Sequence, residues 1–114
     1  MNKVGEVFEP EKIGCREMNI PELAKVVTSR YMIRAACWAY RNPTIYIKNR
    51  CFRFRVSGHH HRGYVYIMLN GADLFDVYYT NIKNVIKKID SDVYGEDLVD
   101  TLDNTIERLP SYVN

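Results

Sequence analysis

Residues 64–79 read YVYIMLNGADLFDVYY, two apolar runs on either side of a central Asn-Gly pair. In the first run Val65, Ile67 and Leu69 share one face, and tyrosines occupy most of the other. Alternation with a period of two is typical of a half-buried strand, and Asn-Gly between two such runs is typical of a hairpin. The segment therefore predicts two antiparallel strands.

The polarity of the second run predicts the length of the turn. A two-residue turn at Asn70-Gly71 would pair Val65 with Asp76 and place a carboxylate on the core face, where an unpaired charge is costly. A loop of three or five residues, with a bulge after Gly71 as one way to build it, sends Asp76 outward instead. We therefore predict the longer loop, which turns three residues inward: Phe75, Val77 and Tyr79.

Further strands are predicted on both sides of this hairpin. Residues 44–48 and 51–56 alternate in the same way, and the β-branched run Val85–Ile89 indicates one more strand. One face of the resulting sheet is apolar: Ile45, Ile47, Phe52, Phe54, Val65, Ile67, Leu69, Phe75 and Val77. The opposite face carries Tyr46, Lys48, Arg53, Arg55, Tyr64, Tyr66, Met68 and Tyr78.

Helix signals stand near both ends of the chain. Asn19 and Glu22 form a capping box around Pro21, which predicts a helix start, and the helical pattern resumes over residues 31–40. Near the C-terminus an apolar stripe at helical spacing runs from Leu98 to Leu109. Its outer side is expected to be solvated and acidic: Asp97, Asp100, Asp103 and Glu107.

Together these patterns predict the α+β class. We expect an antiparallel sheet of four or five strands, with an N-terminal helical segment and a C-terminal helix packed on one face. Residues 1–18 show no clear period and are expected to form an irregular arm, in which Val4–Phe8 could add a short strand. Residues 19–114 are expected to form a single α+β domain.

The charge of the chain is strongly uneven. Residues 23–72 contain no Asp or Glu but nine Lys or Arg, so a modest net charge of +2 conceals +9 here and −7 elsewhere. Three of the nine, Lys25, Arg30 and Arg34, belong to the predicted helical region. The remaining Lys and Arg residues that can act together, and the tyrosines that alternate with them, are expected to form the binding surface. These residues are Tyr46, Lys48, Arg50, Arg53, Arg55, Arg62, Tyr64 and Tyr66.

This set predicts a surface that contacts nucleic acid, single-stranded DNA or RNA, or a nucleoprotein. Arginines bind phosphates and stack on planar groups, and tyrosines provide platforms for unpaired bases. The same residues also suit any solvent-facing strand, where Arg53 or Arg55 over a tyrosine would be a cation–π pair. Two other readings stay open: a protein that binds and inhibits or modulates a host or defence protein, and a homodimer closed through this face.

The sequence favours binding over catalysis. No nucleophile, base and orienting group stand in a recognisable local pattern, and the glycines mark turns rather than a phosphate-binding loop. We therefore predict no enzymatic activity and no cofactor. The run His59-His60-His61 lies between two strands with no carboxylate or cysteine spaced to complete a metal site, so a polar loop is expected.

Cysteine use and hydropathy indicate the cytoplasm. Cys15, Cys37 and Cys51 are odd in number and form no CxxC pair, which favours reduced thiols. No apolar run approaches the roughly 20 residues that span a bilayer, and residues 1–10 lack the apolar core of a signal peptide. No membrane partner is therefore expected.

Residues 63–109 contain two motifs, at Leu69–Val77 and Val93–Leu98, that resemble those of a family of small proteins common in bacteriophages and mobile elements. The family's Leu-Asn-x-x-Asp-Leu-[Tyr/Phe]-Asp-Val motif matches Leu69–Val77, and its Val-Tyr-x-x-x-Leu helix start matches Val93–Leu98. Asn19–Val27 is similar to the family's leading helix, whereas Arg34–Tyr40 replaces its Thr-Gly-Ala-Lys-Asn-Phe segment. The family has no established activity, so the resemblance implies context: a small accessory protein in a host-cell cytoplasm.

Overall fold

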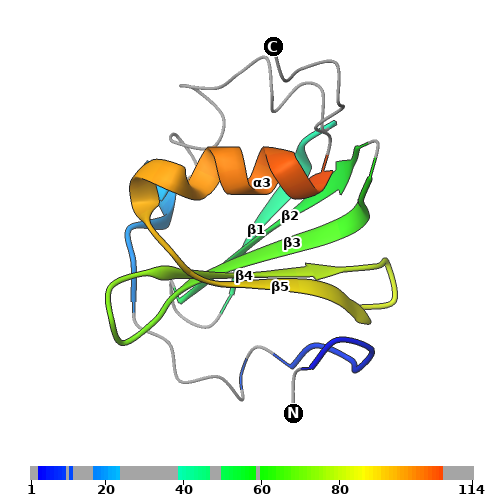
Figure 1. Cartoon of the computed structure of the whole chain (residues 1–114), viewed down its shortest axis with the longest axis horizontal. Helices are drawn as coiled ribbons and strands as arrows, with labels where there is room; N and C mark the ends of the chain where they lie inside the picture. The colour runs from blue at the N-terminus through cyan, green and yellow to red at the C-terminus, as the bar shows by residue number, and fades with distance from the viewer. Residues whose placement is uncertain are drawn as a thin grey trace.

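A computed structural model describes residues 3–9, 11, 17–23, 39–46, 50–58 and 60–106 of the chain. Its centre is one antiparallel sheet in which each strand pairs with the next along the chain (Figure 1). A short 3₁₀ turn and a helix follow the sheet, and the predicted α+β class is confirmed. The elements are β1 (Arg41–Tyr46), β2 (Cys51–Ser57), β3 (Arg62–Leu69), β4 (Phe75–Thr80), β5 (Ile86–Val93), η2 (Gly95–Asp97) and α3 (Leu98–Ile106).

The longer β3–β4 loop is confirmed. Leu69 pairs with Phe75, which leaves a five-residue loop between the strands. The side-chain oxygen of Asn70 accepts hydrogen bonds from the amides of Ala72 at 2.9 Å and Leu74 at 3.2 Å. This local capping holds the register that buries Val77 completely.

The β4–β5 loop repeats the same architecture, which sequence reasoning missed. Asn81 Oδ1 accepts hydrogen bonds from the amides of Lys83 at 2.9 Å and Val85 at 3.0 Å. Asp73 in the first loop and Asn84 in the second adopt left-handed backbone angles, with φ of 62° and 64°. The signal is an Asn followed three residues later by Asp or Asn, residue types that tolerate this conformation.

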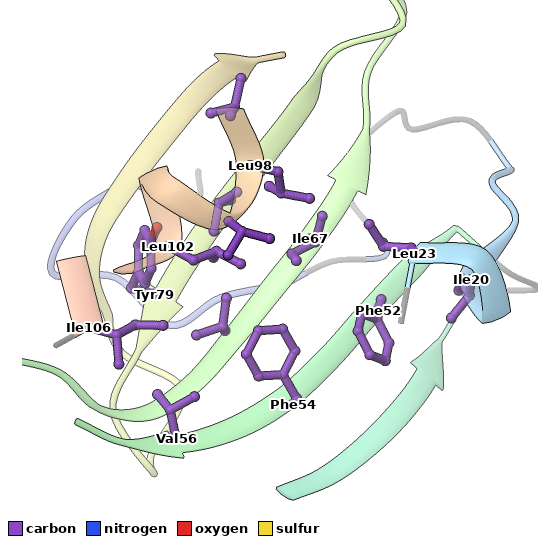
Figure 2. Packing of buried hydrophobic residues seen from close by; sticks show 14 residues of the cluster. Ile20, Leu23, Phe52, Phe54, Val56, Ile67, Tyr79, Leu98, Leu102 and Ile106 are labelled. Atoms are coloured by element: carbon purple, nitrogen blue, oxygen red, sulfur yellow. The ribbon is translucent and has the colours of Figure 1, made fainter. Parts of the chain in front are cut away.

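One hydrophobic cluster joins helical residues to the sheet (Figure 2). The predicted helix start is present, since the Glu22 amide donates to Asn19 Oδ1 at 3.1 Å and residues 20–23 are helical. Tyr40 packs on Phe54 with 4.9 Å between ring centroids. The cluster comprises Ile20, Leu23, Phe52, Phe54, Val56, Val65, Ile67, Val77, Tyr79, Val93, Leu98, Val99, Leu102 and Ile106.

Two predicted placements on the side of the sheet that α3 covers are wrong. Ile45, expected in the core, is 52% exposed, because β1 is the outermost strand of the sheet. Asp103, expected on the solvated side of the last helix, is only 3% exposed. It follows Leu102 directly, so it lies at the border of the stripe that α3 turns toward the sheet. Of the predicted helical stretch at 31–40, Ala39 and Tyr40 are not helical and lead directly into β1. Residues 31–38 lie outside the described residues, as do Ile47, Lys48 and Glu107.

Candidate nucleic-acid interface

The second face of the sheet, opposite α3, is partly covered by the N-terminal arm (Figure 1). Val7 forms a β-bridge with Val85, and the Gly5 amide donates to the carbonyl oxygen of Ile86 at 2.8 Å. The side chain of Phe8 is 5% exposed, with its ring centroid 4.5 Å from those of both Tyr66 and Tyr78. The arm therefore adds a short strand-like segment beside β5 and anchors it with one aromatic side chain.

This cover corrects the expectation that Tyr66 and Met68 face solvent. They are 4% and 1% exposed, and they form a second hydrophobic cluster with Phe8, Ile86 and the buried, reduced thiol of Cys51. The Tyr66 hydroxyl also donates to Asn84 Oδ1 at 2.6 Å. With the arm in place, the ring of Tyr66 offers no free face on which a base could stack.

Arg53 of β2 and Tyr64 of β3 lie on this second face and are less buried than Tyr66 and Met68. The two strands place Arg53 opposite Tyr66 and Arg55 opposite Tyr64. The guanidinium carbon of Arg53 nevertheless lies 4.3 Å from the centroid of the Tyr64 ring, a diagonal cation–π contact. Both side chains are half-buried, so this pair contributes positive charge to the surface, while one face of the Tyr64 ring is already in use.

A basic groove of about 360 Å³ opens at one end of the sheet. Arg41 pairs with Arg55 across β1 and β2, and Ser57 pairs with Arg62 across β2 and β3. These pairings bring together three arginines that are 7 to 21 residues apart in sequence. We call this the arginine groove, lined by Arg41, Arg55, Val56, Ser57, Arg62, Gly63, Asn81 and Ile82.

The lining of the arginine groove carries a net positive charge. None of its eight lining residues is acidic, so the three positive charges are not neutralised from within the groove. Arg41 Nη1 donates to the carbonyl oxygen of Ala39 at 2.8 Å, which orients its guanidinium group. Arginine forks match the oxygens of a phosphate group, and the groove can therefore bind one.

Among the described residues, the predicted binding residues do not all lie in one site. Arg55 and Arg62 lie in the groove, whereas Arg50 is exposed just before β2, about 17 Å from Arg55 at 3.3 Å per residue. Lys48 and the side chain of Tyr46 lie outside the described residues. Sequence reasoning missed Arg41, because only the β1–β2 pairing, which includes an irregularity after Arg41, brings it opposite Arg55.

Two histidines of the loop between β2 and β3, His60 and His61, connect this loop to the end of α3. The amides of His60 and His61 donate to the carbonyl oxygen of Ile106 at 2.8 and 3.3 Å and so bind the end of α3. His61 is 7% exposed, contrary to the expected polar loop, and its Nε2 lies 3.2 Å from the carbonyl oxygen of Tyr64. Its ring packs edge-on against Tyr79 at 5.5 Å.

Burial of His61 predicts a loss of stability in mild acid. Desolvation lowers the pKa of its imidazole below the ordinary 6.5, although hydrogen bonds to backbone carbonyls partly oppose this. The unfolded chain then binds the proton more readily, so the free energy of unfolding falls as pH drops from 6.5 toward the folded pKa. We expect His61→Gln to flatten this pH dependence in denaturant titrations, and His60→Gln, at an exposed site, to leave it intact. If the free energy of unfolding depended on pH equally in both variants, the assignment of this effect to His61 would be contradicted.

Comparison with known proteins finds no matching family model, curated protein or solved structure. Within the described ranges, no helix is long and apolar enough to cross a membrane. The observations that bear on function are therefore the geometry and charge of the groove and of the covered sheet face.

Proposed function

We propose that this chain is a non-enzymatic nucleic-acid-binding module, an accessory protein of phage or mobile-element type that acts in the cytoplasm. The observation that carries the proposal is the arginine groove, where Arg41, Arg55 and Arg62 converge without an acidic neighbour in its lining. Arg53, stacked on Tyr64, adds a fourth positively charged side chain on the adjoining sheet surface. Such clusters contribute most of the affinity of proteins for nucleic acids.

The expected mode of contact is to phosphates rather than to bases. Phe8 covers the ring of Tyr66, and Arg53 occupies one face of the Tyr64 ring, so little aromatic surface is open for stacking. Phosphate contacts position a nucleic acid but carry no sequence information. We therefore expect weak discrimination between sequences, with single-stranded DNA or RNA as the first substrates to test.

Binding should depend strongly on salt. If the three groove arginines and Arg53 neutralise about four phosphates, the slope of log affinity against log salt should be roughly −2.8 for a single strand. Fluorescence anisotropy with a labelled oligonucleotide of about 15 nucleotides, at about 50 and 200 mM salt, measures this slope. Arg55→Ala should weaken binding and make this slope less negative by about 0.7.

Arg50→Ala is the matched control, since it removes the same charge from an exposed position just before β2. We expect it to change affinity less than Arg55→Ala does. If the wild-type protein binds no oligonucleotide at the lower salt concentration, the proposed function is rejected. In that case the groove would be a contact for an acidic protein surface, and a pull-down of host protein that Arg55→Glu disrupts would test this second reading.

A further inference from the structure

The three arginines come from three adjacent strands and line one groove. Arg41 begins β1, Arg62 begins β3, and Arg55 lies near the end of β2, so all three stand at the same end of the sheet. A surface that follows a nucleic-acid strand spreads its bases along the backbone. Three arginines around one groove instead match a single compact group with more than one negative charge.

We infer that the arginine groove binds a phosphate monoester, either the terminal phosphate of a nucleic-acid strand or the phosphate of a free nucleotide. A phosphate monoester carries nearly two negative charges at pH 7 and presents three strong acceptor oxygens, whereas an internal phosphodiester carries one charge. Three arginine forks therefore complement the monoester better. The strand-end form of this inference rests on the proposed function; the free-nucleotide form does not.

The size and lining of the groove suit one nucleotide. Its volume of about 360 Å³ is at the lower end of the range for small-ligand sites. The hydroxyl group of Ser57 is a further hydrogen-bond donor, and the side chain of Ile82, which is 60% exposed, offers apolar surface beside the charged part. The arginines would hold the phosphate, and the sugar or base would lie against Ile82.

The test compares one oligonucleotide sequence with a 5′-phosphate, a 3′-phosphate or hydroxyl groups at both ends. We expect a terminal phosphate to tighten binding by about tenfold, the effect of one additional charge-assisted contact. Arg41→Ala and Arg55→Ala should each remove this preference, and Arg50→Ala should retain it. Arg55→Lys keeps the charge but loses the planar fork, so it should lose most of the preference while circular dichroism shows an unchanged fold.

Adenosine monophosphate and inorganic phosphate distinguish the two sources of the monoester. Both should compete with the phosphorylated oligonucleotide, and adenosine should not. Equal affinity for phosphorylated and unphosphorylated oligonucleotides would overturn the inference while leaving the proposed function in place. Binding of adenosine monophosphate that requires Arg55, without binding of any oligonucleotide, would support the site and reject the proposed function. Failure of every phosphate species to bind would reject both.

Discussion

Gly63→Ala is expected to lower the free energy of unfolding by about 3 kcal/mol or more. Gly63 has a φ of +138°, a backbone angle that residues with a side chain rarely adopt. A Cβ atom there would lie 2.1 Å from the carbonyl oxygen of Thr80 and 2.9 Å from the Cα of Asn81. Both are backbone atoms of the neighbouring strand and its loop, so the overlap cannot be relieved by rotating a side chain.

Chemical denaturation followed by circular dichroism measures this effect, and Gly71→Ala is the matched control. A Cβ at Gly71 would meet nothing within 4 Å, so we expect a change within about 0.5 kcal/mol. Because Gly63 lines the arginine groove, its replacement should also weaken oligonucleotide binding. A Gly63→Ala protein with the denaturation midpoint of the wild type would show that the β3–β4 pairing at this end differs from the one described.

Phe8→Ala is expected to release the N-terminal arm and to lower the free energy of unfolding by about 2–3 kcal/mol. Phe8 is the one buried side chain among described residues 3–9, and it covers the rings of Tyr66 and Tyr78. Without this side chain, three backbone hydrogen bonds remain to hold the segment: two of 2.8 Å between the arm and Ile86, and one of 2.7 Å from the amide of residue 8 to the carbonyl oxygen of Asn84. The loss should be smaller than for a central core residue, because the arm can detach while the sheet stays folded.

Two measurements separate arm release from general destabilisation. Hydrogen exchange should accelerate at the amide of Ile86, which donates to the carbonyl oxygen of Glu6, and less at the centre of β3. Burial raises the pKa of Tyr78, with a smaller contribution from Asp76, so in Phe8→Ala this pKa should fall toward its ordinary value. Val7→Ala, at a side chain that is 57% exposed, should change neither property. Unchanged exchange at Ile86 in Phe8→Ala would contradict the anchoring role.

Release of the arm would also alter the candidate interface. Tyr66, which Phe8 covers in the folded chain, would become available beside Arg53 and Tyr64. Oligonucleotide binding by Phe8→Ala should then gain a contribution from base stacking, which is less sensitive to salt than phosphate contacts are. A comparison of salt slopes between the wild type and this variant would detect the change.

Much of the sheet follows from local chemistry. A strand sends successive side chains to opposite faces, so the alternation of residues 51–56 and 64–69 was enough to predict that Phe52, Phe54 and Val65 turn toward the core. The polarity of Asp76 was enough to exclude a two-residue turn, because that register would bury a carboxylate. The asparagine-capped β4–β5 loop was equally local and could have been recognised from its similarity to the first loop.

The candidate site depended on non-local pairing. The alternation placed Arg53 and Arg55 correctly opposite Phe52 and Phe54, but it could not show what covers the second face. Phe8 lies more than 50 residues from Tyr66 in the sequence, and nothing in its own segment marks it as an aromatic anchor. Arg41 was similarly overlooked, since its contact with the groove depends on how β1 aligns with β2.

For β2, β3 and β4 the sequence by itself determined which way the residues point, because that direction is a property of the strand's own backbone. Only the tertiary structure decided which of those residues meet solvent and which charges converge. Coverage of Tyr66 by the arm and convergence of Arg41, Arg55 and Arg62 both arise from pairing between distant segments. Such pairings are selected by the apolar surface and backbone hydrogen bonds of the whole fold, which no local pattern contains.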